Sequence, residues 1–528
     1  MTLPARPSAA AYTPDTDYLR DRELLDTLQR DAFRYMWEDA DPHSGMVYEG
    51  TWQSDVRPLA VGGTGFGIAA VVCATDRGWI TREEAVQRLM KIALFLRDKT
   101  PREELKGAFP HWLDGTGKAV KFGKGDEDAD LVETSLLMQG LLIARAYFNG
   151  PGVEAELRSV ITGLWEAVDW NWFTNREENG LYWHWSPKRG FRMGLKILGY
   201  NECLITYVLA ASSPTHPISR KAYNYWTSGK GYRPKEVYGY KVEAALPGAG
   251  PLFLAHYSFI GLDPRRMADA FVPRGYFVRN VMHTLSNRGY CLFAAPAKNR
   301  YSEEFWGLTA GQIKDGYAAS EPANDKGTVT PTAALSSMPY TPHYSMQVLQ
   351  NLAGRLRDKI WGPCGPYDGI SLRDAWVSSD YLAIDQLPIV CMVENYRSGL
   401  LWSLFMSDPE IRAGLDKAGI VEPAHAEGFP EAVVALVRDG KRYVPDAHDL
   451  RRHPDTGRYV LPYFTEEAGD VTFLFKDEDG REILCLAQNA AKGRNRLLFA
   501  PFMRPDGSIL TLTMRTARGE YSVPLRLN

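Results

Sequence analysis

The sequence predicts a large all-α domain followed by a small all-β domain, and three observations carry this prediction. The 528-residue chain has 45% hydrophobic and 24% charged residues, the usual mix of a globular protein with a large core. Helical spacing of apolar residues recurs up to about residue 405, whereas short β-rich runs dominate after Pro423. All 14 tryptophans lie between Trp37 and Trp402, so the two regions also differ in composition.

Apolar residues spaced three and four apart indicate helices at 17–41, 64–76, 81–99, 131–148, 153–170, 202–212, 251–260, 267–285, 341–360 and 383–405. Thr81 and Glu84 have the spacing of a capping box at one helix start. Several of these segments are apolar on every side, which a simple bundle cannot bury. A closed double layer of antiparallel helices can bury them, because its inner ring is apolar and its outer ring is amphipathic. We therefore expect an α/α toroid whose long, aromatic-rich loops form a pocket at one rim.

The β-rich runs cover 432–444, 458–465, 471–475, 482–488, 496–502 and 508–513, and Asp-Gly turns separate several of them. We expect three parts of the chain: an N-terminal arm at 1–16, the helical domain at 17–422 and a β-rich accessory domain at 423–528.

Charge and motif content exclude several classes of protein. With 61 basic and 64 acidic side chains the net charge is −3, which offers nucleic acids no electrostatic footprint. Six cysteines are scattered singly without a C-x-x-C pair, so we expect neither a metal site nor a disulfide framework. The glycines of 62–67 lack the preceding strand of a dinucleotide fold and more plausibly let two helices approach closely, so no cofactor is expected.

The sequence also bears on where the chain works. No apolar run reaches the roughly 18 residues of a membrane helix. Residues 1–16 hold no apolar core of a secretory signal. We expect a cytoplasmic protein, or a periplasmic one if an export signal has been removed from this sequence.

The densest carboxylate cluster is at 126–133, immediately before an apolar helix. If that helix extends back far enough, Asp126, Asp130 and Glu133 share one face, and mutual repulsion would raise at least one pKa, as in a general acid. The alternative is structural, because Asp130 and Glu133 also have the spacing of a helix cap. Five carboxylates exceed what capping needs, which favours a functional role.

Glu202 is a lone carboxylate at the start of an almost wholly apolar helix. Because burying it without a partner is costly, it pairs, caps the helix or faces a functional cavity. Two carboxylates on opposite sides of a cleft suit glycoside hydrolysis, in which one protonates the leaving oxygen and the other serves water or the sugar carbon.

Aromatic and polar residues in the loops are candidate sugar ligands. The segment 165–185 holds five tryptophans, and Trp183 could offer a platform for a pyranose ring or simply fill the core. Arg397 could reach the same cavity or form a structural ion pair. The full set of candidate substrate-binding residues is Trp183, Tyr200, Asn201, His216, Trp306, Tyr340, Asn395 and Arg397.

Several runs, in this order, resemble glycoside hydrolase family 144, a glucoamylase-like family: Thr64-Gly-Phe-Gly67, Asp130-Leu-Val-Glu133-Thr-Ser, Asn201-Glu202, Ser337-Met-Pro-Tyr-Thr-Pro342 and Ala383-Ile-Asp-Gln386. The resemblance spans about residues 17–417. It implies an (α/α)6 toroid that cleaves linear or cyclic β-1,2-glucan to sophorose or short oligosaccharides, with inversion of the anomeric carbon. Carried onto this chain, it implies Glu202 as the general acid and an acid among Asp126, Asp130 and Glu133 as the base.

Two features depart from that family. Its core does not account for the β-rich tail, and the loop at 307–316 differs from the expected pattern, so substrate length or linkage preference could differ. The alternatives are a transglycosylase on β-1,2-glucan, a non-catalytic glycan-binding toroid and, ranked last, a polysaccharide lyase.

Overall fold

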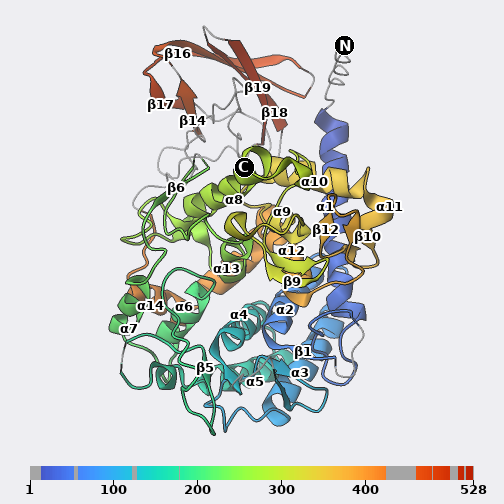
Figure 1. The fold of residues 1–528 in the computed structure, drawn as a ribbon, viewed down its shortest axis with the longest axis vertical. Helices are drawn as coiled ribbons and strands as arrows, with labels where there is room; N and C mark the ends of the chain where they lie inside the picture. The colour runs from blue at the N-terminus through green and yellow to red at the C-terminus, as the bar shows by residue number, and fades with distance from the viewer. Residues whose placement is uncertain are drawn as a thin grey trace. The chain divides into compact units, whose positions relative to one another are not determined.

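The computed structural model describes residues 14–52, 57–121, 128–177, 179–238, 240–423, 459–465, 467–478, 480–499, 509–516 and 519–526 (Figure 1). Leu28–Gly428 forms one compact unit, and the C-terminal strands belong to another. None of the helices among these residues has the length and apolarity needed to span a membrane.

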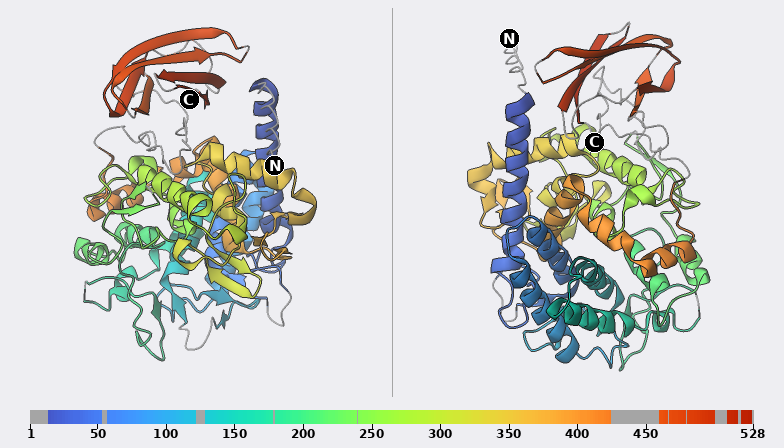
Figure 2. Two further views of the ribbon diagram at one scale, coloured as in Figure 1. Left: turned by 45° about the horizontal axis from the view of Figure 1, so that its top comes forward. Right: turned by 180° about the vertical axis from the view of Figure 1, so that it is seen from behind.

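Helices that are buried on nearly all sides form the centre of the first unit. They are α2 (Val61–Asp76), α4 (Leu131–Tyr147), α6 (Leu204–Ser212), α8 (Tyr276–Phe293), α9 (Pro331–Leu335) and α12 (Ala383–Arg397). Helix α2 packs against α4 and α12, and α4 packs against α6. Figure 2 shows blue α2 and teal α4 side by side when the molecule is seen from behind. Helices α2, α4, α6 and α12 match segments that the sequence marks as apolar, whereas α8 buries several polar residues and α9 was not predicted.

The contact between α2 and α4 is made by backbone. A Cβ added at Gly65 would overlap the carbonyl of Leu136, and one added at Gly140 would overlap the carbonyl of Gly65. Any larger residue at either position would therefore push the two helices apart. This confirms that the glycines of 62–67 serve close helix packing.

A second set of helices is amphipathic and covers the first. It comprises α1 (Pro14–Glu38), α3 (Arg82–Asp98), α5 (Val153–Glu166), α7 (Arg220–Thr227), α10 (Pro342–Ala353), α11 (Arg357–Ile360), α13 (Leu400–Ser407) and α14 (Pro409–Ala418). Helix α3 packs on α5, and α14 packs on α6 and α7. Thr81 and Glu84 form the predicted capping box at the start of α3. The helix-rich architecture predicted from the sequence is confirmed.

Some helix boundaries differ from the prediction, in each case at glycine or proline. Residues 251–260 form two short 3₁₀ helices after Pro251 instead of one α-helix. The helix expected at 267–285 begins at Tyr276, because Pro273 and Gly275, with a φ of +94°, precede it. The segment 383–405 divides at Gly399, where φ is +70°.

Short strands and 3₁₀ turns shape the loops of this unit. The 3₁₀ helices are η1 (Trp170–Thr174), η2 (Leu252–Ala255), η3 (Tyr257–Ile260), η4 (Pro264–Arg266), η5 (Ala297–Asn299) and η6 (Pro322–Asn324). The strands are β1 (Leu59–Ala60), β2 (Trp112–Leu113), β3 (Ala119–Val120), β4 (Ala129–Asp130), β5 (His184–Trp185), β6 (Lys235–Val237), β7 (Tyr240–Val242), β8 (Ala310–Ile313), β9 (Gly316–Ala319), β10 (Trp361–Gly362), β11 (Gly365–Pro366), β12 (Ile370–Ser371) and β13 (Trp376–Val377).

The C-terminal unit is built of antiparallel strands. They are β14 (Tyr459–Thr465), β15 (Gly469–Lys476), β16 (Glu482–Ala490), β17 (Gly493–Phe499), β18 (Ile509–Thr516) and β19 (Gly519–Arg526). Strands β16-β15-β18-β19 form one sheet and β14-β17 a second, around a core that includes Phe473, Phe475 and Leu512. Five predicted runs match strands, β19 was missed, and the run at 432–444 lies outside the described residues.

Candidate functional site

The first turns of four buried helices meet at one end of the helical unit. The backbone N–H of Gly62 in α2 donates to Glu133 Oε2 in α4 at 2.8 Å. The hydroxyls of Ser135 in α4 and Thr206 in α6 lie 2.7 Å apart. A Cβ added at Gly63 would lie 2.7 Å from that of Ala383, the first residue of α12. Because helix N-termini carry partial positive charge, this end favours carboxylates.

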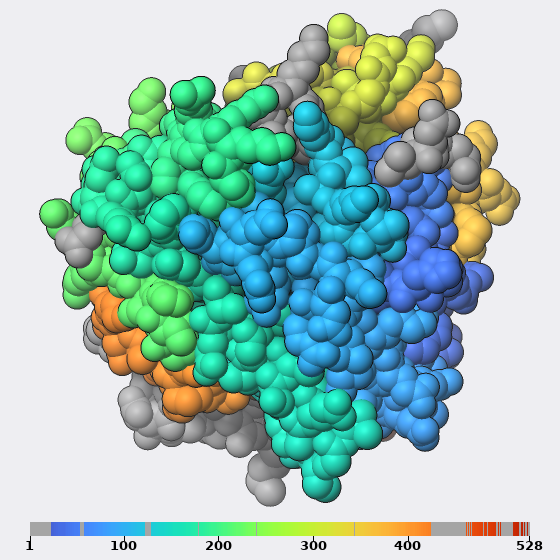
Figure 3. All heavy atoms as spheres, turned by 90° about the horizontal axis from the view of Figure 1, so that it is seen from below, coloured from blue at the N-terminus to red at the C-terminus, as the bar shows by residue number. Residues whose placement is uncertain are grey.

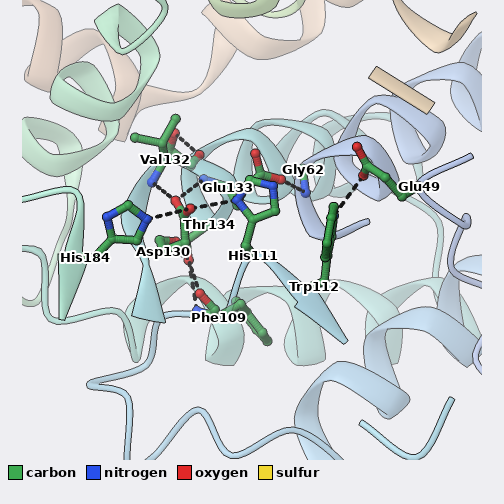
Figure 4. A network of polar contacts seen from close by, with 11 residues as sticks. Glu49, Gly62, Phe109, His111, Trp112, Asp130, Val132, Glu133, Thr134 and His184 are labelled. Carbon is green, nitrogen blue, oxygen red and sulfur yellow. Dashed lines mark hydrogen bonds and ion pairs between the residues drawn. The ribbon is translucent and has the colours of Figure 1, made fainter. Parts of the chain in front are cut away.

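Asp130 is the N-cap of α4 and is fully buried. Its Oδ1 accepts hydrogen bonds of 3.0 Å from the backbone N–H groups of Val132 and Glu133. Its Oδ2 lies 2.9 Å from His111 Nδ1 and 3.4 Å from His184 Nε2 (Figure 4). Helix α4 starts at Leu131, so Asp130 does not share a helical face with Glu133. The capping interpretation of the cluster therefore holds for Asp130.

Strand pairing places the two histidines. Asp130 in β4 pairs with His184 in β5, and its backbone N–H donates to the carbonyl of Phe109, two residues before His111. The backbone N–H of Leu131 donates to the carbonyl of Trp183. The blue segments before residue 121 and the green segments around 150–200 lie side by side on the face shown in Figure 3. Three stretches distant in sequence thus converge on Asp130.

The ionisation of His111 and Glu133 is set by this network. Burial alone would lower the pKa of His111, but Glu133, Asp130 and Glu49 more than offset it and raise the pKa to about 10. Burial raises the pKa of Glu133 to about 7, with further increases from Asp130 and Glu49 and opposing effects from His111 and the Gly62 N–H. The pKa of Asp130 is lowered because its hydrogen bonds and charge interactions with the two histidines outweigh its burial. Glu133 is partly exposed and can titrate near neutral pH.

Glu202 lies in the turn just before α6, which begins at Leu204, two residues later than the helix start that the sequence suggested. Its backbone carbonyl accepts a hydrogen bond from Ser258 Oγ, while its side chain is partly exposed. Burial, and then the negative charge of Asp130, raise the pKa of Glu202. Glu202 is thus a carboxyl group with a raised pKa beside the same set of helix N-termini.

The structure adds acids that the sequence reasoning missed. Glu49 accepts a hydrogen bond of 3.1 Å from Trp112 Nε1, and burial raises its pKa. Asp385, in the first turn of α12, is buried against Asp368. Burial and the Asp368 carboxylate raise the pKa of Asp385 well above its usual value, and burial raises that of Asp368 to about 6, so the pair shares a proton. Asp385 lies in the Ala383-Ile-Asp-Gln386 motif. Its position near a helix start was the signal that could have identified it as a candidate acid.

Other predicted site residues serve the packing of the helices. Tyr340 is buried, and its hydroxyl donates to the carbonyl of Ala255. Asn395 donates to the carbonyl of Ile260, and Arg397 donates to Gln29 Oε1. Trp306 is fully buried. Tyr340 and Asn395 are thus buried and bonded to protein backbone, and the sugar-binding role of these residues and of Trp306 stays a prediction.

The remaining candidates divide between the two ends of α6. Trp183 is partly exposed and stacks on His184, and Asn201 caps the turn through a 3.0 Å bond from the Cys203 N–H, so both lie at the acid-rich end. Tyr200 is buried with the Arg279 guanidinium over its ring. His216 is exposed beyond the other end of α6, a helix about 13 Å long, and is therefore separated from the acids.

Two further points complete the site. Asp126 lies outside the described residues. Within the described ranges, no group of three or more His, Cys, Asp and Glu side chains is placed to hold a metal ion.

The raised pKa of His111 predicts a pH-dependent contribution to stability. A folded-state pKa of about 10, above the usual 6.5, gives stabilisation that is complete below about pH 6.5 and lost as the pH rises through 10. The Tm difference between the unmodified chain and His111→Gln should therefore be largest at pH 6 and shrink towards pH 10 in thermal melts. His216→Gln, at an exposed histidine, is the control, and a pH-independent difference for His111→Gln would contradict the prediction.

A family model described as "Putative glucoamylase" matches residues 194–409. The chain is 40% identical over 425 residues to an exo β-1,2-glucooligosaccharide sophorohydrolase (non-reducing end) from Parabacteroides distasonis; the match covers 76% of this chain and 58% of that protein.

Two solved structures match with higher identity. An endo-β-1,2-glucanase from Chitinophaga pinensis, in complex with sophorotriose and glucose, is 44% identical with a TM-score of 0.74, covering 76% of this chain and 99% of that one. A protein from Bacteroides caccae that carries the same family description is 45% identical with a TM-score of 0.73, covering 76% and 100%. The chain therefore belongs to the glucoamylase-like family of β-1,2-glucanases, glycoside hydrolase family 144.

Proposed function

We propose that the chain is a glycoside hydrolase that cleaves β-1,2-glucan to sophorose or short β-1,2-linked oligosaccharides. The observation that carries this proposal is the meeting of Glu202 with Asp130 and Glu133 at one set of helix N-termini. It occurs in a chain that is 44% identical to an endo-β-1,2-glucanase across 99% of that chain. A glycosidase needs paired carboxyl groups, and this end of the unit holds two with a raised pKa, Glu202 and Glu133, and one with a lowered pKa, Asp130.

We infer that the helices close into an (α/α)6 toroid with the buried helices as its inner ring. Parallel inner helices with their N-termini at one rim are what such a ring requires, and α2, α4, α6 and α12 have this arrangement. The partial positive charges of those N-termini would then face the substrate and hold the catalytic carboxylates at the rim.

In the proposed reaction Glu202, whose pKa is raised, donates its proton to the glycosidic oxygen as the bond to the anomeric carbon breaks. A carboxylate on the opposite side takes a proton from the attacking water, and the new bond forms with inversion. Of the two candidate bases that the structure describes, Glu133 is partly exposed, whereas Asp130 is fully buried and engaged with His111 and His184. Glu133 therefore carries the base role in this proposal, and Asp130 positions it.

The test is product analysis on linear and cyclic β-1,2-glucan, with β-1,3- and β-1,4-glucans as controls. The expected result is release of sophorose or short β-1,2-linked oligosaccharides with the α-anomer formed first, seen by proton NMR within the first minutes. Products longer than the substrate would identify a transglycosylase. Saturable binding without product would identify a glycan-binding protein, and absorbance from an unsaturated sugar would identify a lyase.

A further inference from the structure

The hairpin of β8 and β9 stands on the buried pair Asp368 and Asp385. The backbone N–H of Gln312 in β8 donates to Asp368 Oδ2 at 2.6 Å, and the Ser378 hydroxyl donates to the Gln312 side chain. Gly369 allows the Gln312 backbone to approach this closely, because a Cβ at position 369 would overlap the carbonyl of Gln312. The hairpin is therefore fixed to the acid-rich end of the unit. It includes residues 310–316 of the loop that is expected from the sequence to differ from the family pattern.

Tyr317 is the exposed aromatic residue of this hairpin. It lies directly across from Gln312 in the β8–β9 register, so both side chains stand on the same face. The residue is 56% exposed, which is unusual for a large aromatic side chain. The tip beside it, Lys314 to Gly316, is exposed as well and does not cover the ring.

The Tyr317 phenol also lies in an acidic electrostatic environment. Burial, and then the negative charges of Asp385, Glu49, Asp368 and Glu202, raise the pKa of the Tyr317 phenol well above its usual value. Among these acids, Asp368 accepts the hydrogen bond from the hairpin backbone, and Asp385 lies in the first turn of α12. The Tyr317 ring is therefore open to solvent at the end of the unit that carries these acids.

We propose that Tyr317 is a stacking platform for a glucose unit of the substrate, held over the acid-rich end by the β8–β9 hairpin. This inference rests on the proposed function. Tyrosine suits the role because one face of a pyranose ring is apolar and loses water on stacking, while the phenol stays hydrated. Tyr317 follows directly on the loop at 307–316, for which the sequence predicts a difference in substrate preference.

The first experiment compares kinetics on β-1,2-glucan. Tyr317→Ala should raise KM by about tenfold with kcat changed less than about threefold, because the platform binds a sugar and takes no part in proton transfer. Tyr317→Phe keeps the ring and should restore KM to within about twofold. Phe271→Ala, at another exposed aromatic residue, is the matched control and should leave KM unchanged. The exposed position of Tyr317 predicts a Tm within about 2 °C of the unmodified chain.

The second experiment measures binding without turnover. In a Glu202→Gln background, Tyr317→Ala should weaken the affinity for β-1,2-gluco-oligosaccharides by about the same factor, measured by titration calorimetry. Gly369→Ala displaces the hairpin and should likewise weaken this affinity, although Tyr317 is still present. Equal affinities with and without the ring, or a Tyr317→Phe variant as weak as Tyr317→Ala, would overturn the inference and leave the proposed function standing. A Glu202→Gln protein that binds no β-1,2-glucan, with an unmodified chain that yields no product, would overturn both.

Discussion

Replacing Glu202 by glutamine is expected to lower kcat on β-1,2-glucan by about 10²- to 10⁴-fold with little change in KM. The amide has nearly the shape of the protonated carboxyl group but cannot give up a proton, so the departing sugar would leave as an alkoxide. Burial and the charge of Asp130 raise the pKa of Glu202, which keeps the proton available for donation in the unmodified chain. Initial rates from reducing-sugar release across pH measure the effect.

A leaving group that needs no protonation gives the sharpest check on this assignment. With an activated aryl β-sophoroside, Glu202→Gln should lose far less activity than with glucan, and its rate should no longer fall as the pH rises through the pKa of Glu202. Glu236→Gln, at an exposed position on the β6–β7 hairpin, is the matched control and should keep full activity. A Glu202→Gln protein as active as the unmodified chain would refute the role.

Replacing Glu394 by glutamine is expected to cost about 3–5 kcal/mol of unfolding free energy. Glu394 is fully buried in α12 and accepts two hydrogen bonds of 2.8 Å from the Arg77 guanidinium, one of 2.6 Å from Ser398 Oγ and one of 3.4 Å from Gln29. Glutamine removes the negative charge that balances Arg77. It also replaces one carboxylate oxygen, which accepts hydrogen bonds, by an NH₂ group, which donates them. Urea denaturation followed by fluorescence measures the loss.

An exposed ion pair and the activity of the folded fraction provide the controls. Glu38→Gln breaks the surface pair with Arg34, in which both side chains are about half exposed, and should cost less than about 1 kcal/mol. Because Glu394 binds α12 to α2 and does not face the acids, the folded Glu394→Gln protein should keep its kcat at low temperature. A stable variant with lost activity would instead place Glu394 in the substrate site.

The sequence predicted the apolar helices and the acid cluster because both are local patterns. The capping box at Thr81 and the glycines that let α2 meet α4 are written in a few adjacent residues, and the structure confirms them. The helix starts were less predictable where Pro273 or Gly399 cuts through an apolar run, since tertiary packing decides whether the helix resumes.

The partners of the acids could not be predicted because they come from distant segments. Asp130 meets His111 and His184 through strand pairings of one or two residues, which leave no periodic signal. Asn395 and Arg397 were expected near the substrate because polar residues in an apolar helix suggest a cavity. The structure shows that Asn395 donates to a backbone carbonyl and Arg397 to Gln29. A buried polar residue and a ligand-binding one look alike until their partners are known.

The backbone contact between Gly65 and Gly140 limits how this protein can change. Where two helices touch through their main chains, no side chain separates them whose size could change. The distance between the two helices is therefore fixed. Substitutions elsewhere in α2 or α4 cannot easily widen or narrow the distance between the groups mounted there. Adaptation to another glycan would therefore require changes in the hairpins around α2 and α4, because the lengths and tips of hairpins can vary at small cost in stability.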